Sequence, residues 1–210
     1  MNLDWLLATP IAHRGLHDVA NGRPENSREA FVHAAERGFP IELDVQLVAG
    51  KLLVAHDPIR EETDAPTLQD VLADVGGRVP LLIDLKSANR AALARAIAPA
   101  LEGYAGHVAL QDFNPLSLAV LRRAAYPRGQ ISGRLDPAPA LIRPLARAMP
   151  TNALLRPAFM NVELAALPSR ATSFWRRRGM PLLAWTIRTP EEARRAAAVA
   201  DNYLFSGFIP

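Results

Sequence analysis

Short apolar runs alternate along the chain with longer stretches whose apolar residues recur at helical spacing. The short runs predict eight strands, at Ile11–Gly15, Ile41–Val48, Leu81–Lys86, Val108–Phe113, Gln130–Arg134, Phe159–Glu163, Leu182–Ile187 and Tyr203–Phe208. The longer stretches predict seven helices, at Ser27–Arg37, Leu68–Val75, Arg90–Leu101, Leu116–Ala124, Leu141–Ala148, Arg170–Arg178 and Pro190–Ala200. Eight strands with helices between them in 210 residues describe a compact (β/α)8 TIM barrel better than an open sheet.

Three further features refine this α/β architecture. Lys51–Ala55 predicts a hairpin arm that extends the second strand, and Leu3–Leu7 is apolar enough to cover the bottom of the barrel. Asn26 stands three residues before Glu29, as the cap does in a capping box, and therefore predicts the start of the first helix. The length predicts a single domain over residues 1–210, with no large insertion after the second strand.

Composition and charge narrow the function classes. Half of the residues are hydrophobic and 21% are charged, which excludes a disordered or fibrous chain. The net charge of +3 is too small to favour nucleic acid as a partner, and the run Arg176–Arg178 is predicted to be a solvated helix face. The absence of cysteine excludes disulfides, thiolate metal sites and a cysteine nucleophile. Met1–Thr9 has no basic leader, so we expect no signal peptide, no stable membrane anchor and a cytoplasmic location.

Acidic residues cluster where two neighbouring predicted strands end. Residues two apart on a strand project to the same side, so Glu42 with Asp44, and Asp84 with Lys86, are expected to point into the barrel mouth. Three buried carboxylates with only Lys86 and Arg14 to offset them favour a divalent cation with oxygen ligands, namely Mg²⁺, Ca²⁺ or Mn²⁺. The alternative from spacing alone is that the three acids form structural salt bridges across the barrel.

Two histidines also fall at predicted strand ends. His13 precedes Arg14, and His56 precedes Asp57 at the end of the hairpin arm. A histidine pair beside a cation and a guanidinium would suit acid–base catalysis on a phosphate ester. A single histidine at a strand end is more often structural, but two that converge on a carboxylate trio favour catalysis.

The order of these motifs resembles one enzyme family over nearly the whole chain. The matching segments are His13-Arg14-Gly15, Pro24-Glu25-Asn26-Ser27, Glu42-Leu43-Asp44-Val45, His56-Asp57, Asp84-Leu85-Lys86, Gln111-Asp112-Phe113-Asn114 and Ala184-Trp185-Thr186-Ile187. Together they closely resemble the signature of the glycerophosphodiester phosphodiesterases. The resemblance implies a TIM-barrel hydrolase that uses a divalent cation to cleave small-molecule glycerophosphodiesters to glycerol 3-phosphate and an alcohol.

The resemblance also implies a role for each matching residue. His13 and His56 match the acid–base histidines, Arg14 and Lys86 match phosphate-binding cations, Glu42, Asp44 and Asp84 match the metal ligands, and Trp185 and Phe113 match aromatic residues at the substrate's glycerol or alcohol end. For Trp185 ordinary core packing is an equally good interpretation, and for Phe113 it is the favoured one. Glu25 and Asn26 are expected to be structural.

Two departures from the family pattern bear on the site. The third ligand is Asp84 where many relatives have glutamate, which shortens its reach by one methylene. Only 26 residues separate Asp57 from Asp84, where the family commonly has a longer insertion that helps to cover the site. We therefore expect an open mouth that admits bulky headgroups or excludes water poorly.

Two alternative functions remain open at this point. An open mouth would allow phospholipase D-like or cyclising cleavage of lysophospholipids on the same barrel. A catalytically silent barrel used for binding is the alternative from another class. The second is disfavoured because a barrel without catalysis has no physical need for so many acids at its rim.

Overall fold

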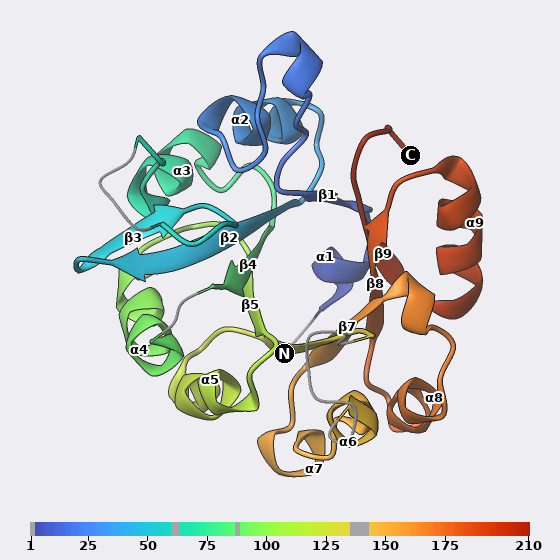
Figure 1. Cartoon of the computed structure of the whole chain (residues 1–210). Helices are drawn as coiled ribbons and strands as arrows, with labels where there is room; N and C mark the ends of the chain where they lie inside the picture. Colours follow the sequence, from blue (N-terminus) through green and yellow to red (C-terminus); the bar gives the residue numbers. More distant parts are fainter. Residues whose placement is uncertain (1–2, 60–63, 87–88, 135–142) are drawn as a thin grey trace.

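The fold is a closed barrel of parallel strands (Figure 1). The computed structural model describes residues 3–59, 64–86, 89–134 and 143–210. Its strands are β1 (Ile11–His13), β2 (Ile41–Val48), β3 (Lys51–Val54), β4 (Leu81–Leu85), β5 (Val108–Asp112), β6 (Arg128–Ser132), β7 (Phe159–Glu163), β8 (Leu182–Ile187) and β9 (Asn202–Phe205). The hydrogen-bonded order is β1-β9-β8-β7-β6-β5-β4-β2-β3, and a β1–β2 pairing closes the ring. The eight parallel strands thus confirm the predicted (β/α)8 barrel.

The predicted hairpin arm is also confirmed. Strand β3 pairs antiparallel with the end of β2, from Val45 with Val54 to Val48 with Lys51. Ala49 and Gly50 form the turn, with φ of 47° and 81° respectively. In Figure 1 this arm reaches outward from the ring of strands. The arm ends next to His56, so it carries that histidine to the barrel mouth.

Helices surround the barrel, one or more after each of most strands (Figure 1). The α-helices are α1 (Asp4–Leu7), α2 (Arg28–Glu36), α3 (Leu68–Val75), α4 (Arg90–Ala100), α5 (Pro115–Val120), α6 (Arg143–Ala148), α7 (Asn152–Leu155), α8 (Arg170–Arg176) and α9 (Pro190–Val199). Short 3₁₀ turns lie at Val19–Asn21, Leu121–Arg123 and Leu164–Ala166. None of the described helices is both long enough and apolar enough to span a membrane.

Two apolar layers hold the strands in place. A large apolar cluster fills the space between the barrel and its helices. A smaller cluster fills the lower part of the barrel interior and consists of Leu6, Ile11, Leu82, Ala109, Phe159, Leu183 and Leu204. The interior strand positions follow the period of two, so Leu82 packs inside and Asp84 lies above it on the same face. Because α1 contributes Leu6 to the interior cluster, the predicted cover over the barrel bottom is confirmed.

Several predicted boundaries were wrong by a few residues. Strand β6 begins at Arg128 rather than Gln130 and ends at Ser132, because Arg128 accepts a backbone hydrogen bond from Ala158 and starts the ladder earlier. The last strand ends at Phe205 rather than Phe208, because Gly207 has φ of 80° and leaves the extended conformation. Helix α7 was not predicted, since four residues are too short for a periodic signal. The first two residues of the predicted helix Leu141–Ala148 lie outside the described residues.

Candidate active site

The three predicted carboxylates meet in one place. Glu42 and Asp44 lie on β2 and Asp84 lies on β4, where Asp44 and Asp84 are register partners. One oxygen from each of the three lies within 4.8 Å of the others, and all three side chains are buried. The alternation of side chains along two adjacent parallel strands therefore brings three acids to one face, as the spacing predicted.

Two cations partly offset these charges. Lys86 places Nζ 2.7 Å from Asp84 Oδ2 and 3.5 Å from Asp44 Oδ1. Arg14 places Nε 3.2 Å from Asp44 Oδ2, and its Nη1 donates to Glu25 Oε1 at 2.6 Å. The structural salt bridges considered as an alternative therefore exist for two of the three acids.

Lys86 and Arg14 do not neutralise the negative charge of Glu42 with an ion pair. Its Oε2 accepts a hydrogen bond from the backbone N–H of Arg14 at 3.0 Å, and His13 Nε2 lies 4.0 Å away. Within the described part of the chain, no guanidinium or ammonium group lies within ion-pair distance of Glu42. Asp84 Oδ1 is likewise buried without a hydrogen-bond donor. A buried carboxylate oxygen without a donor is costly, so the trio is short of positive charge.

The pKa values reflect this deficit. Burial, followed by the charges of Asp44 and Asp84, raises the pKa of Glu42 well above its ordinary value. Burial also raises the pKa of Asp84 to about 7, although the charge of Lys86 lowers it. The carboxylates thus compete for charge compensation that the protein does not fully supply. A divalent cation with oxygen ligands fits this donor set, because it would add the missing positive charge and use the oxygens that lack donors.

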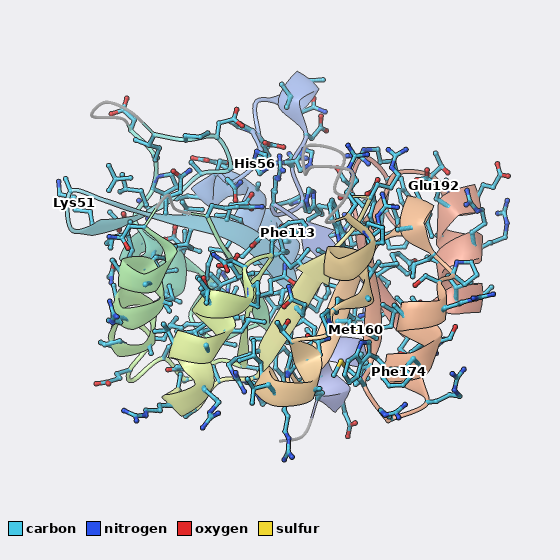
Figure 2. The ribbon with its side chains drawn as sticks, turned by 60° about the horizontal axis from the view of Figure 1, so that its bottom comes forward. Lys51, His56, Phe113, Met160, Phe174 and Glu192 are labelled. Atoms are coloured by element: carbon cyan, nitrogen blue, oxygen red, sulfur yellow. The ribbon has the colours of Figure 1, made fainter. Side chains whose placement is uncertain are left out.

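The two histidines approach the cluster from different elements. His13 is the last residue of β1, and burial, followed by the charge of Arg14, lowers its pKa well below the ordinary value. Both effects favour the neutral imidazole over the imidazolium. His56 follows β3 and is more exposed, with Nδ1 3.0 Å from Asp57 Oδ1. In Figure 2 His56 lies at the same end of the barrel as Phe113, above Met160 and far from Phe174.

All nine predicted site residues line a single cavity of about 210 Å³. Its wall consists of His13, Arg14, Glu42, Asp44, His56, Asp84, Lys86, Gln111, Phe113, Ile131, Asn161, Trp185 and Leu204. The two aromatic rings meet edge to face, with Phe113 and Trp185 centroids 5.8 Å apart. Lys86 Nζ lies 5.6 Å from the Phe113 centroid. Phe113, for which core packing was the favoured interpretation, thus contributes to the cavity wall beside a cation.

The chain bends sharply between β1 and α2 to form this site. Arg14 has φ of 58°, a left-handed conformation that is strained for a residue with a Cβ. Gly15 follows with φ of 81°, and a Cβ there would lie 3.0 Å from Ala30 and Phe31. The bend turns the backbone N–H of Arg14 toward Glu42 and its side chain toward Asp44.

The structure corrects the role of Asn26. Ser27 is the N-cap of α2, because its side chain accepts a hydrogen bond from Ala30 N. Asn26 has φ of 56° and holds Asp44 instead: Nδ2 donates to Asp44 Oδ2 at 2.9 Å, and Oδ1 accepts from Asp44 N at 3.2 Å. Sequence reasoning missed this contact because the two residues are 18 positions apart and are joined only when α2 packs beside β2.

Two further cavity residues were also missed. Gln111 is the register partner of Asp84 on the next strand, and its Oε1 accepts a hydrogen bond from Asn161 Nδ2 at 2.9 Å. Trp185 Nε1 donates to the backbone oxygen of Asn161 at 3.3 Å. The period of two relates Gln111 to Phe113, and this signal would have found it.

Comparisons with known proteins place the fold. No family model matches the chain, and no curated protein matches it in sequence. Among solved structures, a phosphodiesterase of Oleispira antarctica in complex with sn-glycerol-3-phosphate has a TM-score of 0.77 at 18% identity, over 95% of this chain and 93% of that one. A glycerophosphodiester phosphodiesterase of Thermotoga maritima has a TM-score of 0.72 at 22% identity, over 93% and 92%.

A third similar structure has a different kind of function. The glycerol uptake operon antiterminator regulatory protein of Listeria monocytogenes has a TM-score of 0.60 at 8% identity, over 95% of this chain and 92% of that one. An enzyme and a regulatory protein thus share this architecture, so the fold by itself does not decide the activity. The chain has the barrel fold of these proteins along nearly its whole length, and its function has to be argued from its own cavity.

Proposed function

We propose that the protein is a metal-dependent glycerophosphodiester phosphodiesterase, which hydrolyses glycerophosphodiesters to glycerol 3-phosphate and an alcohol. The observation that carries this proposal is the single cavity in which three buried carboxylates, two cationic side chains and two histidines converge. Several structures with the same fold carry the name of this activity, which supports the choice of substrate class. The resemblance of the sequence motifs to those of this family also supports it.

Glu42, Asp44 and Asp84 are the residues that would hold the cation. When bound, a divalent cation neutralises charge on a nonbridging phosphate oxygen. Arg14 and Lys86 lie beside the same carboxylates and add positive charge toward the cavity. Removing one such preorganised electrostatic group typically costs on the order of 10² to 10³ in rate.

The two histidines divide the proton transfers. A neutral His13 can accept a proton from the attacking hydroxyl group, because burial disfavours its charged form. His56, more exposed and next to Asp57, can donate a proton to the departing alcohol oxygen. Each proton transfer is worth roughly 10² to 10⁴ in rate. The attacking hydroxyl belongs either to water or to the substrate's own glycerol, and the latter gives a cyclic phosphate first.

Phe113 and Trp185 form the wall that the glycerol or alcohol part of the substrate would contact. A silent binding barrel, the alternative from another class, does not explain why Asp84 Oδ1 and Glu42 are left short of positive charge beside two histidines. For that reason catalysis is the function that the cavity supports best.

The test is a turnover screen. Glycerophosphocholine, glycerophosphoethanolamine and a lysophospholipid would each be assayed with Mg²⁺, Ca²⁺ and Mn²⁺, and the products followed by phosphorus NMR. We expect glycerol 3-phosphate to form and EDTA to stop turnover reversibly. A cyclic phosphate as the end product would favour the cyclising alternative, and no turnover under any condition would contradict the proposal.

Two histidine variants and a control test the residue roles. We expect His13→Ala and His56→Ala each to abolish turnover while the protein stays folded by circular dichroism. His33→Ala, on the outer helix α2, removes a histidine that does not line the cavity and should leave turnover unchanged. Near-wild-type rates in both cavity variants would refute the acid–base assignment.

A further inference from the structure

Three arginines surround a second cavity at the opposite end of the barrel from the site described above. This cavity has a volume of about 460 Å³ and is lined by Arg122, Arg128, Ala153, Leu154, Leu155 and Arg156. Arg128 is the first residue of β6, so the cavity lies where strands begin, whereas the carboxylate site lies where they end. The two cavities share no lining residue.

Backbone carbonyls anchor Arg128, and no acidic side chain among the described residues forms an ion pair with it. Its Nη1 donates to Leu118 O at 2.7 Å, and its Nη2 donates to Leu155 O at 3.2 Å. Burial, followed by the positive charge of Arg122, lowers the pKa of Arg128. Arg122 and Arg128 line the same cavity, so their like charges oppose each other, and backbone carbonyls hold Arg128 in place.

The guanidinium groups of Arg122 and Arg156 are available to bind a ligand. Arg122 lies in the 3₁₀ turn Leu121–Arg123, and Arg156 is the C-cap that follows α7, in a left-handed conformation with φ of 47°. Both are exposed, and within the described part of the chain neither side chain forms an ion pair or a hydrogen bond. Three positive charges thus converge on one concave surface with no carboxylate among the residues that line it.

The cavity also has an apolar side. Leu154 is 74% exposed, one of the most exposed large apolar side chains among the described residues. It lies between Ala153 and Leu155 on α7, beside the guanidinium groups. A ligand that fills this cavity therefore meets both cationic hydrogen-bond donors and an exposed aliphatic side chain.

We propose that this arginine cavity is a second binding site, for a soluble phosphate ester whose phosphate is a dianion and whose ester group is apolar. Guanidinium groups match the geometry of phosphate oxygens and bind them in bidentate fashion. A dianion would cancel most of the repulsion among three arginines, which no lining side chain does. Leu154 provides contact area for the apolar part of the ester.

Arginine side-chain NMR tests the site directly, because each Nε–H gives its own signal and the carboxylate site is read separately through Arg14. Metal-free protein would be titrated with inorganic phosphate and with hexyl phosphate. We expect the Nε–H signals of Arg122 and Arg156 to shift with one saturating curve, and hexyl phosphate to bind several-fold more tightly than phosphate. Shifts that grow linearly without saturation, or spread over all exposed arginines, would show diffuse charge attraction and overturn the proposal.

Matched variants separate the cavity from general charge. We expect Arg122→Gln and Arg156→Gln each to weaken hexyl phosphate binding by about tenfold or more, the range for losing a charged hydrogen bond. Arg123→Gln removes the same charge from the adjacent residue, which does not line the cavity, and should change binding less than about twofold. Equal losses in all three variants would contradict the proposal.

Two further readouts complete the test. Leu154→Ser should remove the preference for hexyl phosphate over inorganic phosphate without weakening the latter. Binding of all variants to vesicles that contain phosphatidylserine, with no binding of the soluble ester, would overturn the proposal in favour of a membrane surface. Arg128 is left unchanged throughout, because its bonds to the backbone carbonyls of Leu118 and Leu155 hold α5 and α7 against β6, and its loss would disturb the fold.

Discussion

Asn26 offers the sharpest test of how the carboxylate site is held together. Its amide makes two buried hydrogen bonds with Asp44, one to the carboxylate at 2.9 Å and one from the backbone N–H at 3.2 Å. Its φ of 56° also demands a residue that tolerates the left-handed conformation. Glycine accepts that conformation and lacks the amide, so Asn26→Gly removes the hydrogen bonds without adding backbone strain, whereas Asn26→Ala removes them and adds backbone strain.

The two hydrogen bonds set the expected magnitude. A hydrogen bond to a charged group contributes about 1.5 to 3 kcal/mol and a neutral one about 0.5 to 1.5 kcal/mol. We therefore expect Asn26→Gly to lower the free energy of unfolding by about 2 to 4 kcal/mol, and Asn26→Ala to lower it by about 1 kcal/mol more. Since Asn26 also orients a proposed metal ligand, we expect divalent-cation affinity to fall about 10- to 100-fold in both variants.

Urea unfolding and calorimetric titration with Mn²⁺ measure the two effects separately. The glycine and alanine variants separate the two effects. Both lack the amide, so the difference in stability between them reports only how well each residue tolerates the left-handed conformation. If Asn26→Gly matched the wild type in both stability and metal affinity, the amide would not hold Asp44 in the way the structure indicates. If alanine were as stable as glycine, the argument from backbone conformation would be wrong.

Three further predictions concern the metal site and the barrel interior. Because the pKa of Asp84 is raised to about 7 and a cation requires the ionised carboxylate, we expect cation affinity by calorimetry to rise from pH 6 to pH 8; equal affinities would refute this. The raised pKa of Asp84 also means that the metal-free protein loses stability as the pH rises toward 7, because ionisation of Asp84 is disfavoured in the folded state. We therefore expect the increase in melting temperature on adding a divalent cation to grow with pH. We expect Gly129→Ala to destabilise the fold by about 1 to 3 kcal/mol in urea unfolding. The new Cβ would lie 2.1 Å from the buried Phe159 ring, whereas in the comparison variant Gly133→Ala the nearest atom would be Glu163 Oε2 at 2.8 Å.

Much of the barrel could be predicted from periodicity. A strand buried on both faces has a short run of apolar residues, and a helix that covers the barrel repeats its apolar residues every three to four positions. The alternation of these two patterns along the chain predicts the (β/α)8 architecture. The strand ends were less predictable. Whether a residue belongs to a strand depends on the neighbour that pairs with it, as Arg128 does by accepting from Ala158, and that neighbour is not visible along the chain.

The candidate site, too, could be predicted from the sequence only in part. Local spacing was enough to predict that Glu42 and Asp44 share a face and that Asp84 and Lys86 do, because the period of two is a property of the strand itself. That Asp44 and Asp84 are direct neighbours follows from the register of β2 with β4. The register is set by packing across the sheet, and only the folded barrel decides it.

The sequence by itself therefore determined the kinds of group available and which of them lie on one side of each strand. Only the tertiary structure decided that Asn26 holds Asp44 rather than capping α2, and that Arg122, Arg128 and Arg156 converge on one cavity. The physical reason is that periodicity acts over a few residues along one element. Hydrogen bonds and charges act through space, between residues that are neighbours only after the barrel has closed.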